Sequence, residues 1–152
     1  MERIYLDTSV FGGYFDKEFE KWTKILFNKI LEGKYKILYS KLTDAELYSA
    51  PKKVKNLVLK IPENQIETVE IIEEVKELAN KYISVNVVGK TSMTDCIHIA
   101  LATIYDADIF VSWNFKHIVN IGKIRGYNSI NYRLGHKILE IRTPREILNY
   151  EE

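Results

Sequence analysis

The sequence predicts an α/β fold, a three-layer α/β/α sandwich with a mainly parallel central sheet. Short apolar runs that end in polar residues recur at 4–6, 36–39 and 107–112, as buried strands of a parallel sheet do. Longer segments between them carry apolar residues three and four positions apart, the pattern of a helix with one apolar face. Strands that are separated by helices favour parallel pairing, with helices covering the sheet.

Composition and charge limit the function classes. The 152 residues suit one domain over residues 1–152, and 46% hydrophobic with 28% charged residues is ordinary for a soluble globular protein. No stretch is apolar for long enough to be a signal peptide or a membrane span, so we expect a cytoplasmic protein with no membrane partner. Although the net charge is only +1, acids gather between 63 and 80 and bases between 113 and 145, which predicts oppositely charged surfaces.

The first predicted strand, residues 4–6, ends at Asp7. A carboxylate therefore stands at the carboxyl end of a buried strand, where ligands bind in open α/β sheets. After the glycine pair at 12–13, apolar residues at helical spacing predict a helix over 15–30. Gly33 ends this helix, because a glycine commonly follows a helix C-terminus.

The second predicted strand, residues 36–39, leads into a short helix that carries two acids. Ser40 is a favourable N-terminal cap for this helix, and Pro51 ends or kinks it. A basic helix is expected over 52–60. An apolar stripe at helical spacing then predicts one long helix over 66–82, so this region is expected to alternate helices without a strand.

A further helix is predicted to begin at Thr94 as its N-terminal cap, with Asp95 in its first turn. The third strand, residues 107–112, follows it. A weaker helix is expected over 115–125. The last predicted elements are a short strand at 138–141 and a turn from Pro144.

Three carboxylates are predicted to meet at one edge of the sheet. Asp7 leaves the first strand, Glu46 lies on the helix after the second, and Asp95 opens the helix before the third. Carboxylates that are about 4 Å apart repel by roughly 1 kcal/mol even in water, and a divalent cation removes that penalty. Oxygen ligands favour Mg²⁺ or Mn²⁺, and no Cys and His spacing typical of a zinc site is present.

Each of these acids also has a purely structural interpretation. Asp7 is suited to capping the turn that follows it, and Asp95 is suited to the positive end of its helix. A cap and a metal ligand are compatible roles, and all three acids at one edge favour a functional site. His98, one turn after Asp95, is within reach of that site but is interpreted as a packing residue.

Two acids on the helix after the second strand compete for the site. Asp44 and Glu46 are two residues apart and therefore point to different faces of the helix. Leu42 and Leu47 place the core beside Glu46, so we assign Glu46 to the site and expect Asp44 to be solvated.

Four segments together resemble the PIN domain family, particularly the toxin ribonucleases of bacterial and archaeal toxin-antitoxin pairs. The resemblance covers nearly the whole chain. It is carried by residues 4–10 (IYLDTSV), 40–46 (SKLTDAE), 94–102 (TDCIHIALA) and 107–115 (ADIFVSWNF). It implies that Asp7, Glu46 and Asp95 bind the metal.

The resemblance also implies a function and partners. A VapC-like toxin would be a Mg²⁺- or Mn²⁺-dependent endoribonuclease, with RNA as substrate, a small DNA-binding antitoxin as partner and a homodimer as the usual state. The family commonly has a fourth acid after the third strand, where this chain has Asn114, whose amide oxygen can still serve a metal or a water. Ser112 corresponds to a small hydroxyl residue that supports the site by hydrogen bonding.

Other functions remain as alternatives. A catalytically weak or inactive PIN-fold module that binds RNA or protein is suggested by Asn114. A haloacid-dehalogenase-type phosphatase needs a second carboxylate two residues after the first, where this chain has Ser9. A dinucleotide enzyme is disfavoured because no glycine-rich fingerprint follows the first strand. Trp113 and Phe115 suit either stacking on RNA bases or core packing.

Overall fold

A computed structural model describes residues 1–87 and 92–149. Its sheet has five strands, all parallel, in the order β3-β2-β1-β4-β5. The strands are β1 (Glu2–Leu6), β2 (Tyr35–Ser40), β3 (Ile66–Val69), β4 (Ile109–Val111) and β5 (Glu140–Arg142). The chain starts in the middle of the sheet, builds outward through β2 and β3, and then returns to the other side of β1. The neighbours β1 and β4 therefore form a switch point, where open α/β sheets place a ligand crevice.

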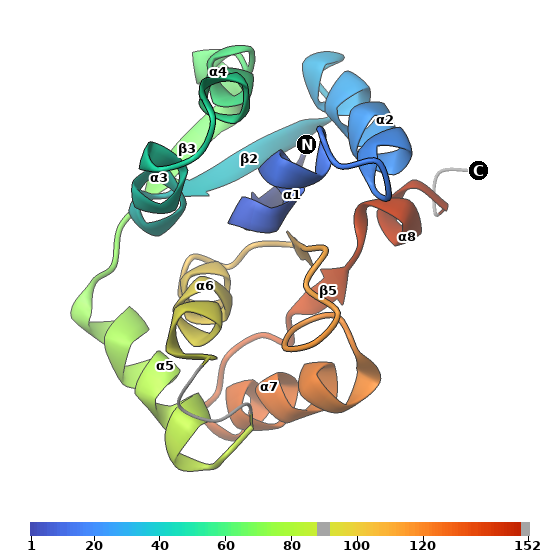
Figure 1. Ribbon diagram of the computed structural model, residues 1–152. Coiled ribbons are helices and arrows are strands. Elements are labelled where there is room, and N and C mark those ends of the chain that lie inside the picture. Colours follow the sequence, from blue (N-terminus) through green and yellow to red (C-terminus); the bar gives the residue numbers. More distant parts are fainter. Residues whose placement is uncertain (88–91, 150–152) are drawn as a thin grey trace.

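Helices cover both faces of the sheet (Figure 1). One face is covered by α1 (Thr8–Gly13), α2 (Glu20–Leu31), α3 (Lys41–Tyr48), α4 (Lys52–Leu59) and α8 (Pro144–Asn149). The other is covered by α5 (Glu73–Ser84), α6 (Met93–Ile104) and α7 (Ile121–Arg133). The predicted three-layer α/β/α architecture is therefore confirmed, with a sheet that is wholly parallel.

The two cores follow from the alternation of side chains along each strand. In β1, Ile4 and Leu6 belong to the core under α1 and α2, whereas Tyr5 belongs to the core under α5 and α6. All three side chains are fully buried. Because β1 is covered by helices on both faces, the position at which the chain leaves this strand is fixed at the edge of the sheet.

The prediction of one long helix over 66–82 is wrong. Residues Ile66–Val69 form β3, an edge strand beside β2, and the helix α5 begins only at Glu73. A short 3-10 turn, Glu63–Gln65, precedes the strand, and Gln65 donates hydrogen bonds to the carbonyls of Ile30 and Tyr35. Gln65 thereby anchors the start of β3 to the end of α2 and the start of β2.

Three predicted helix boundaries are also wrong. The segment 15–30 contains the helix α2, which begins at Glu20. The turn expected from Pro144 is the helix α8, and the helix α1, which ends in the glycine pair, was not predicted. Thr94 lies inside α6, whose N-terminal cap position is Ser92. The helix expected over 115–125 begins at Ile121, because Asn120 caps it by accepting a hydrogen bond from the Lys123 N–H.

Other local predictions agree with the structure. Ser40 caps α3 by accepting a hydrogen bond from the Thr43 N–H, and Asp95 lies in the first turn of α6. Gly33 follows α2 with a positive φ of 88°, a conformation that glycine adopts without a steric cost. Within the described ranges, none of the helices combines the length and apolar character that crossing a bilayer requires.

Candidate active site

The candidate site lies where β1 and β4 end. Asp7 follows β1, and Ser112 follows β4 in the neighbouring position of the sheet, since Leu6 pairs with Val111. The N–H of Asp7 donates to the Val111 carbonyl, which extends the pairing by one residue. The topology therefore brings these two polar residues together at the switch point.

Asp7 is buried, with only 4% of its surface exposed. It occupies the N-terminal cap position of α1, yet its side chain makes no capping hydrogen bond. Instead, Ser9 donates to Oδ1 and Ser112 donates to Oδ2, both at 2.6 Å. Burial raises the pKa of Asp7, although these two hydrogen bonds oppose the rise. The fold therefore holds this carboxylate in an orientation that capping does not explain.

Asn114 connects the end of β4 to the helix α6. Its backbone N–H donates to Ser112 Oγ at 2.9 Å, and its side-chain Nδ2 donates to Asp95 Oδ1 at 3.3 Å. Burial raises the pKa of Asp95, and the charge of Glu46 adds to the rise. Asp7, Ser112, Asn114 and Asp95 thus form one hydrogen-bonded chain across the switch point.

Glu46 reaches the same region from α3. Thr8 donates to Glu46 Oε1 at 2.6 Å, and His98 Nε2 lies 2.6 Å from the same oxygen. Burial alone would raise the pKa of Glu46, but the hydrogen bonds from His98 and Thr8 hold it below its ordinary value. Glu46 is therefore ionised at neutral pH, and its Oε2 makes none of these contacts.

His98 connects Glu46 to a buried hydrogen-bond network. The Nδ1 of His98 lies 2.6 Å from the hydroxyl of Tyr5, and that hydroxyl donates to Ser40 Oγ at 2.9 Å. His98, Tyr5 and Ser40 are all buried. The network links α6, β1 and the cap of α3, so the position of Glu46 is fixed by three separate elements.

The three predicted carboxylates are electrostatic neighbours. The charge of Asp95 contributes to the raised pKa of Asp7, and the charge of Glu46 contributes to that of Asp95. Within residues 1–87 and 92–149, no three Asp, Glu, His or Cys side chains converge tightly enough to form a ready metal shell. The protein alone therefore supplies neighbouring carboxylates rather than a closed cage.

This donor set fits a hard divalent cation. Mg²⁺ normally takes one or two carboxylates and keeps several waters, so a closed protein cage is not needed. Asp7 and Asp95 are the candidates for direct contact, because burial raises the pKa of both, whereas the hydrogen bonds from His98 and Thr8 offset the burial of Glu46. A cation between Asp7 and Asp95 would relieve the penalty that burial places on their charges.

Sequence reasoning missed two residues of this site. His98 is not simply a packing histidine, because it contacts Glu46, and its spacing of three residues from Asp95 was the signal for it. Thr8 had no such signal. Asp44 is exposed and accepts a hydrogen bond from Tyr39, as expected for an acid outside the site. Ser9 donates to Asp7, so the second carboxylate of a dehalogenase-type phosphatase is absent at that position.

Comparisons with known proteins agree with this fold. The profile of the PIN domain family matches residues 4–116. Among solved structures, the chain is similar to VapBC2 from Rickettsia felis bound to a DNA fragment from their promoter, with a TM-score of 0.54 and 15% sequence identity. That similarity covers 93% of this chain and 98% of the other. No curated protein matches the sequence.

Proposed function

Because the chain belongs to the PIN domain family, whose members are generally nucleases, we propose that it is a metal-dependent endoribonuclease that hydrolyses RNA phosphodiester bonds. The observation that carries the proposal is the hydrogen-bonded chain from Asp7 through Ser112 and Asn114 to Asp95. These hydrogen-bonded residues lie at the switch point of the sheet, the usual place for a ligand in such folds.

In this proposal, Asp7 and Asp95 would hold Mg²⁺ or Mn²⁺, and Glu46 would complete the set of carboxylates around the ion. The ion would supply Lewis-acid chemistry, polarising a phosphate oxygen and making a water more acidic. Ser9 and Ser112 keep both oxygens of Asp7 in place through their hydrogen bonds. Asn114 positions Asp95 by donating to its Oδ1.

Glu46 orients the attacking water. Its Oε1 is occupied by Thr8 and His98, which leaves Oε2 to accept a hydrogen bond from water. Because the pKa of Glu46 is lowered, the carboxylate is ionised and can orient the water by accepting its hydrogen bond. As the water oxygen attacks phosphorus, the bond from phosphorus to the leaving ribose oxygen would break. The proton that the water loses would pass to solvent, and the leaving oxygen would take a proton from solvent. His98 acts as a positioning residue for Glu46 in this scheme.

A cleavage assay tests this proposal. End-labelled single-stranded RNA should be cut internally with Mg²⁺ or Mn²⁺ and left intact with EDTA. Asp7→Asn should reduce the cleavage rate by at least about a hundredfold, since it removes a ligand charge. Asp44→Asn is the matched control, an exposed acid on α3 whose loss should leave the rate unchanged. Equal cleavage by both variants would contradict the proposal.

A second candidate function rests on Asn114. Where the family commonly has an acid, this chain has an amide that donates to Asp95. An amide adds no negative charge for a second cation, so a catalytically weak or inactive module that binds RNA or protein would have the same fold. Retained RNA binding without metal-dependent cleavage would favour this alternative.

The partners follow from the same family relationship. One structural neighbour is VapBC2 bound to a DNA fragment from their promoter. By analogy, this chain would be the cytoplasmic toxin of a toxin-antitoxin pair and would bind a small DNA-binding antitoxin. A homodimer is proposed as its own assembly, since two-fold dimers are the commonest closed oligomers. Copurification with the product of a neighbouring gene would test the antitoxin.

A further inference from the structure

A pocket lies beside the segment that carries Asn114. This pocket of about 760 Å³ is lined by four aromatic residues and by exposed arginines, and we call it the aromatic pocket. The residues that define it here are Phe19, Trp22, Trp113, Phe115, Arg125 and Arg145. Its volume falls within the range of roughly 300 to 1,000 Å³ that holds a drug-sized ligand, so it has room for a nucleotide.

The aromatic pocket and the carboxylates share one short segment after β4. Asn114 turns toward Asp95, while its neighbours Trp113 and Phe115 line the pocket. The N–H of Trp113 donates to Ser9 Oγ, and that same oxygen donates to Asp7. The floor of the pocket is therefore two hydrogen bonds from the most buried carboxylate of the site.

The aromatic floor is rigid. The rings of Phe19 and Trp113 are stacked with centroids 4.3 Å apart, and Trp113 Nε1 donates to Thr23 Oγ1 at 2.9 Å. Phe115 lies 6.2 Å from both of those rings and is 50% exposed. A half-exposed ring on a fixed aromatic base offers a face on which a planar group can stack.

The other wall is cationic. The Arg145 guanidinium lies 5.1 Å from the centroid of the Trp22 ring, and Arg125 is exposed on α7. Arg142 also lines the pocket, at the end of β5 beside Ser112, whose N–H donates to its carbonyl. The acids in the lining are Glu18 and Glu146, and Glu146 is engaged by the Thr143 N–H. Arginines beside aromatic faces suit a ligand that carries both phosphates and planar bases.

We propose that the aromatic pocket binds one or two nucleotides of single-stranded RNA next to the phosphodiester bond that is cut. A base stacks on Phe115, and the adjoining phosphate pairs with Arg125 or Arg145. This inference rests on the proposed function, because it assigns the pocket to the same substrate. A peptide would also find apolar contacts there, but continuity with the carboxylates and the pairing of guanidinium with aromatic groups favour a nucleic acid strand.

The protein contains its own reporter for this binding. It has two tryptophans, Trp22 and Trp113, and both line the aromatic pocket. Adding a short oligouridylate in EDTA should quench their fluorescence without any cleavage. The quenching should weaken as salt rises, because the phosphates are neutralised by arginines. A duplex RNA of the same length should not quench, since its bases are already stacked on one another.

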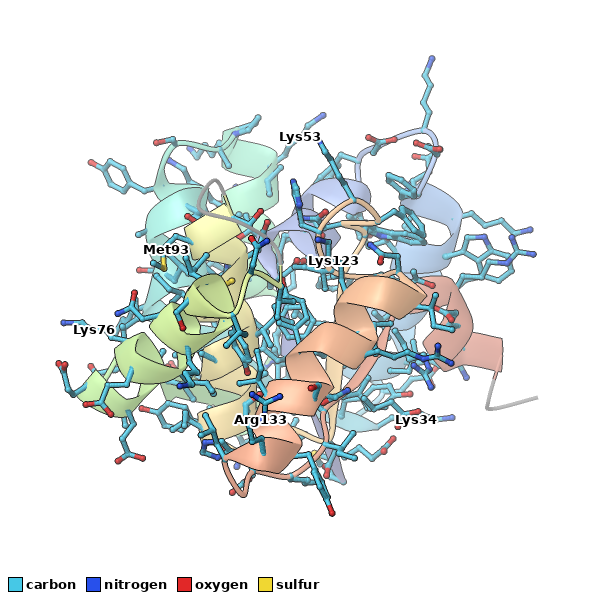
Figure 2. The ribbon with its side chains drawn as sticks, turned by 90° about the horizontal axis from the view of Figure 1, so that it is seen from below. Lys34, Lys53, Lys76, Met93, Lys123 and Arg133 are labelled. Carbon is cyan, nitrogen blue, oxygen red and sulfur yellow. The ribbon has the colours of Figure 1, made fainter. Side chains whose placement is uncertain are left out.

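Three variants complete the test. Phe115→Leu and Arg125→Gln should each weaken binding of the oligouridylate by about tenfold, as loss of a stacking face or a phosphate contact does. Arg133→Gln is the matched control, because Arg133 lies at the far end of α7 from Lys123 (Figure 2) and outside the pocket. Its affinity should equal that of the wild type.

The outcomes separate this inference from the proposed function. Quenching that depends on Phe115 and Arg125, in a protein that never cleaves RNA, would support the pocket while the nuclease proposal fails. Cleavage that is unaffected by Phe115→Leu and Arg125→Gln, without quenching by single-stranded RNA, would overturn the pocket. Unaffected cleavage without quenching is the result expected if a protein segment, rather than RNA, fills the aromatic pocket.

Discussion

Asp7 is a buried carboxylate whose charge disfavours the folded protein. Its folded-state pKa is raised, chiefly by burial, above the ordinary value of 3.8. Ionising it therefore costs the folded state more than the unfolded state, so stability falls as pH rises through the window above 3.8. Below that window the group is protonated in both states and has no such effect.

Asp7→Asn should accordingly stabilise the protein in EDTA at neutral pH, by about 0.5–2 kcal/mol as for other substitutions that relieve functional strain. The gain should shrink as the pH falls toward 3.8. The same variant should lose the rise in melting temperature that Mn²⁺ gives the wild type by mass action. Thermal unfolding with EDTA and with Mn²⁺ measures both effects. If the variant is less stable than wild type in EDTA and its melting temperature still rises equally with Mn²⁺, Asp7 is not part of the metal site.

The buried hydrogen-bond network that connects His98, Tyr5 and Ser40 leads to a separate prediction. Tyr5→Phe leaves His98 Nδ1 and Ser40 Oγ without their shared hydroxyl partner inside the core. An unsatisfied buried polar group costs roughly 1–3 kcal/mol, so unfolding in urea should require about that much less free energy. Tyr105→Phe is the control, since its hydroxyl contacts the Glu70 carbonyl at the surface and its loss should cost under about 0.5 kcal/mol. Equal effects of the two substitutions would contradict the network.

At the site, sequence reasoning was informative about residues that end a strand or open a helix. Asp7 and Asp95 have such positions, and the structure brings both to the switch point with Glu46 beside them. It was uninformative about Thr8, and for His98 the spacing from Asp95 indicated reach but not the contact with Glu46. Both contacts depend on how α3 packs against α1 and α6. No local pattern encodes that packing, which comes from the two cores as a whole.

Among the elements, α1 depends on a glycine that lets an aromatic ring approach closely. A Cβ on Gly13 would lie 2.7 Å from the Trp113 ring and 3.1 Å from Thr23 Oγ1. Gly13→Ala should therefore destabilise the protein by about 1–3 kcal/mol, as overpacking does, and disturb the Trp113 fluorescence.

Gly12 is the matched control on the same helix. A Cβ there would meet nothing within 4 Å, so Gly12→Ala should be neutral or stabilise by up to about 1 kcal/mol through helix propensity. Denaturant unfolding of the two variants gives the comparison. A Gly13→Ala protein as stable as the Gly12→Ala protein would show that α1 does not pack on Trp113 as described.

The strand that sequence reasoning missed is β3. Its apolar residues Ile66 and Val69 are three apart and continue the spacing of Ile72 and Val75, so they match a helical stripe. Four residues are too few to show the alternation of a strand. What makes the segment a strand is its pairing with β2, a long-range contact that local spacing does not encode. The strands 4–6 and 107–112 were predictable because their apolar runs are followed by polar residues at the sheet edge.

On the scale of the whole molecule, the surface carries an apolar patch formed by Tyr48 and Leu59, which are 81% and 80% exposed. The two residues line one shallow pocket between α3 and α4. Exposed apolar neighbours of this kind favour self-association, so sedimentation at micromolar concentration should show a dimer. Leu59→Asp should shift it toward the monomer, whereas Ile138→Asp, an exposed residue elsewhere, should not. A monomeric wild type would contradict the dimer proposal.

The most direct test of the account compares RNA cleavage by wild type, Asp95→Asn and Asn114→Asp in the presence of Mg²⁺ or Mn²⁺. Asp95→Asn should stay folded and lose cleavage. Asn114→Asp should bind metal more tightly and cut faster, because it adds a carboxylate next to Asp95. The same added charge should make Asn114→Asp less stable than wild type in EDTA, with stability regained on adding Mg²⁺. Equal, trace cleavage by all three proteins would contradict a nuclease built on these carboxylates.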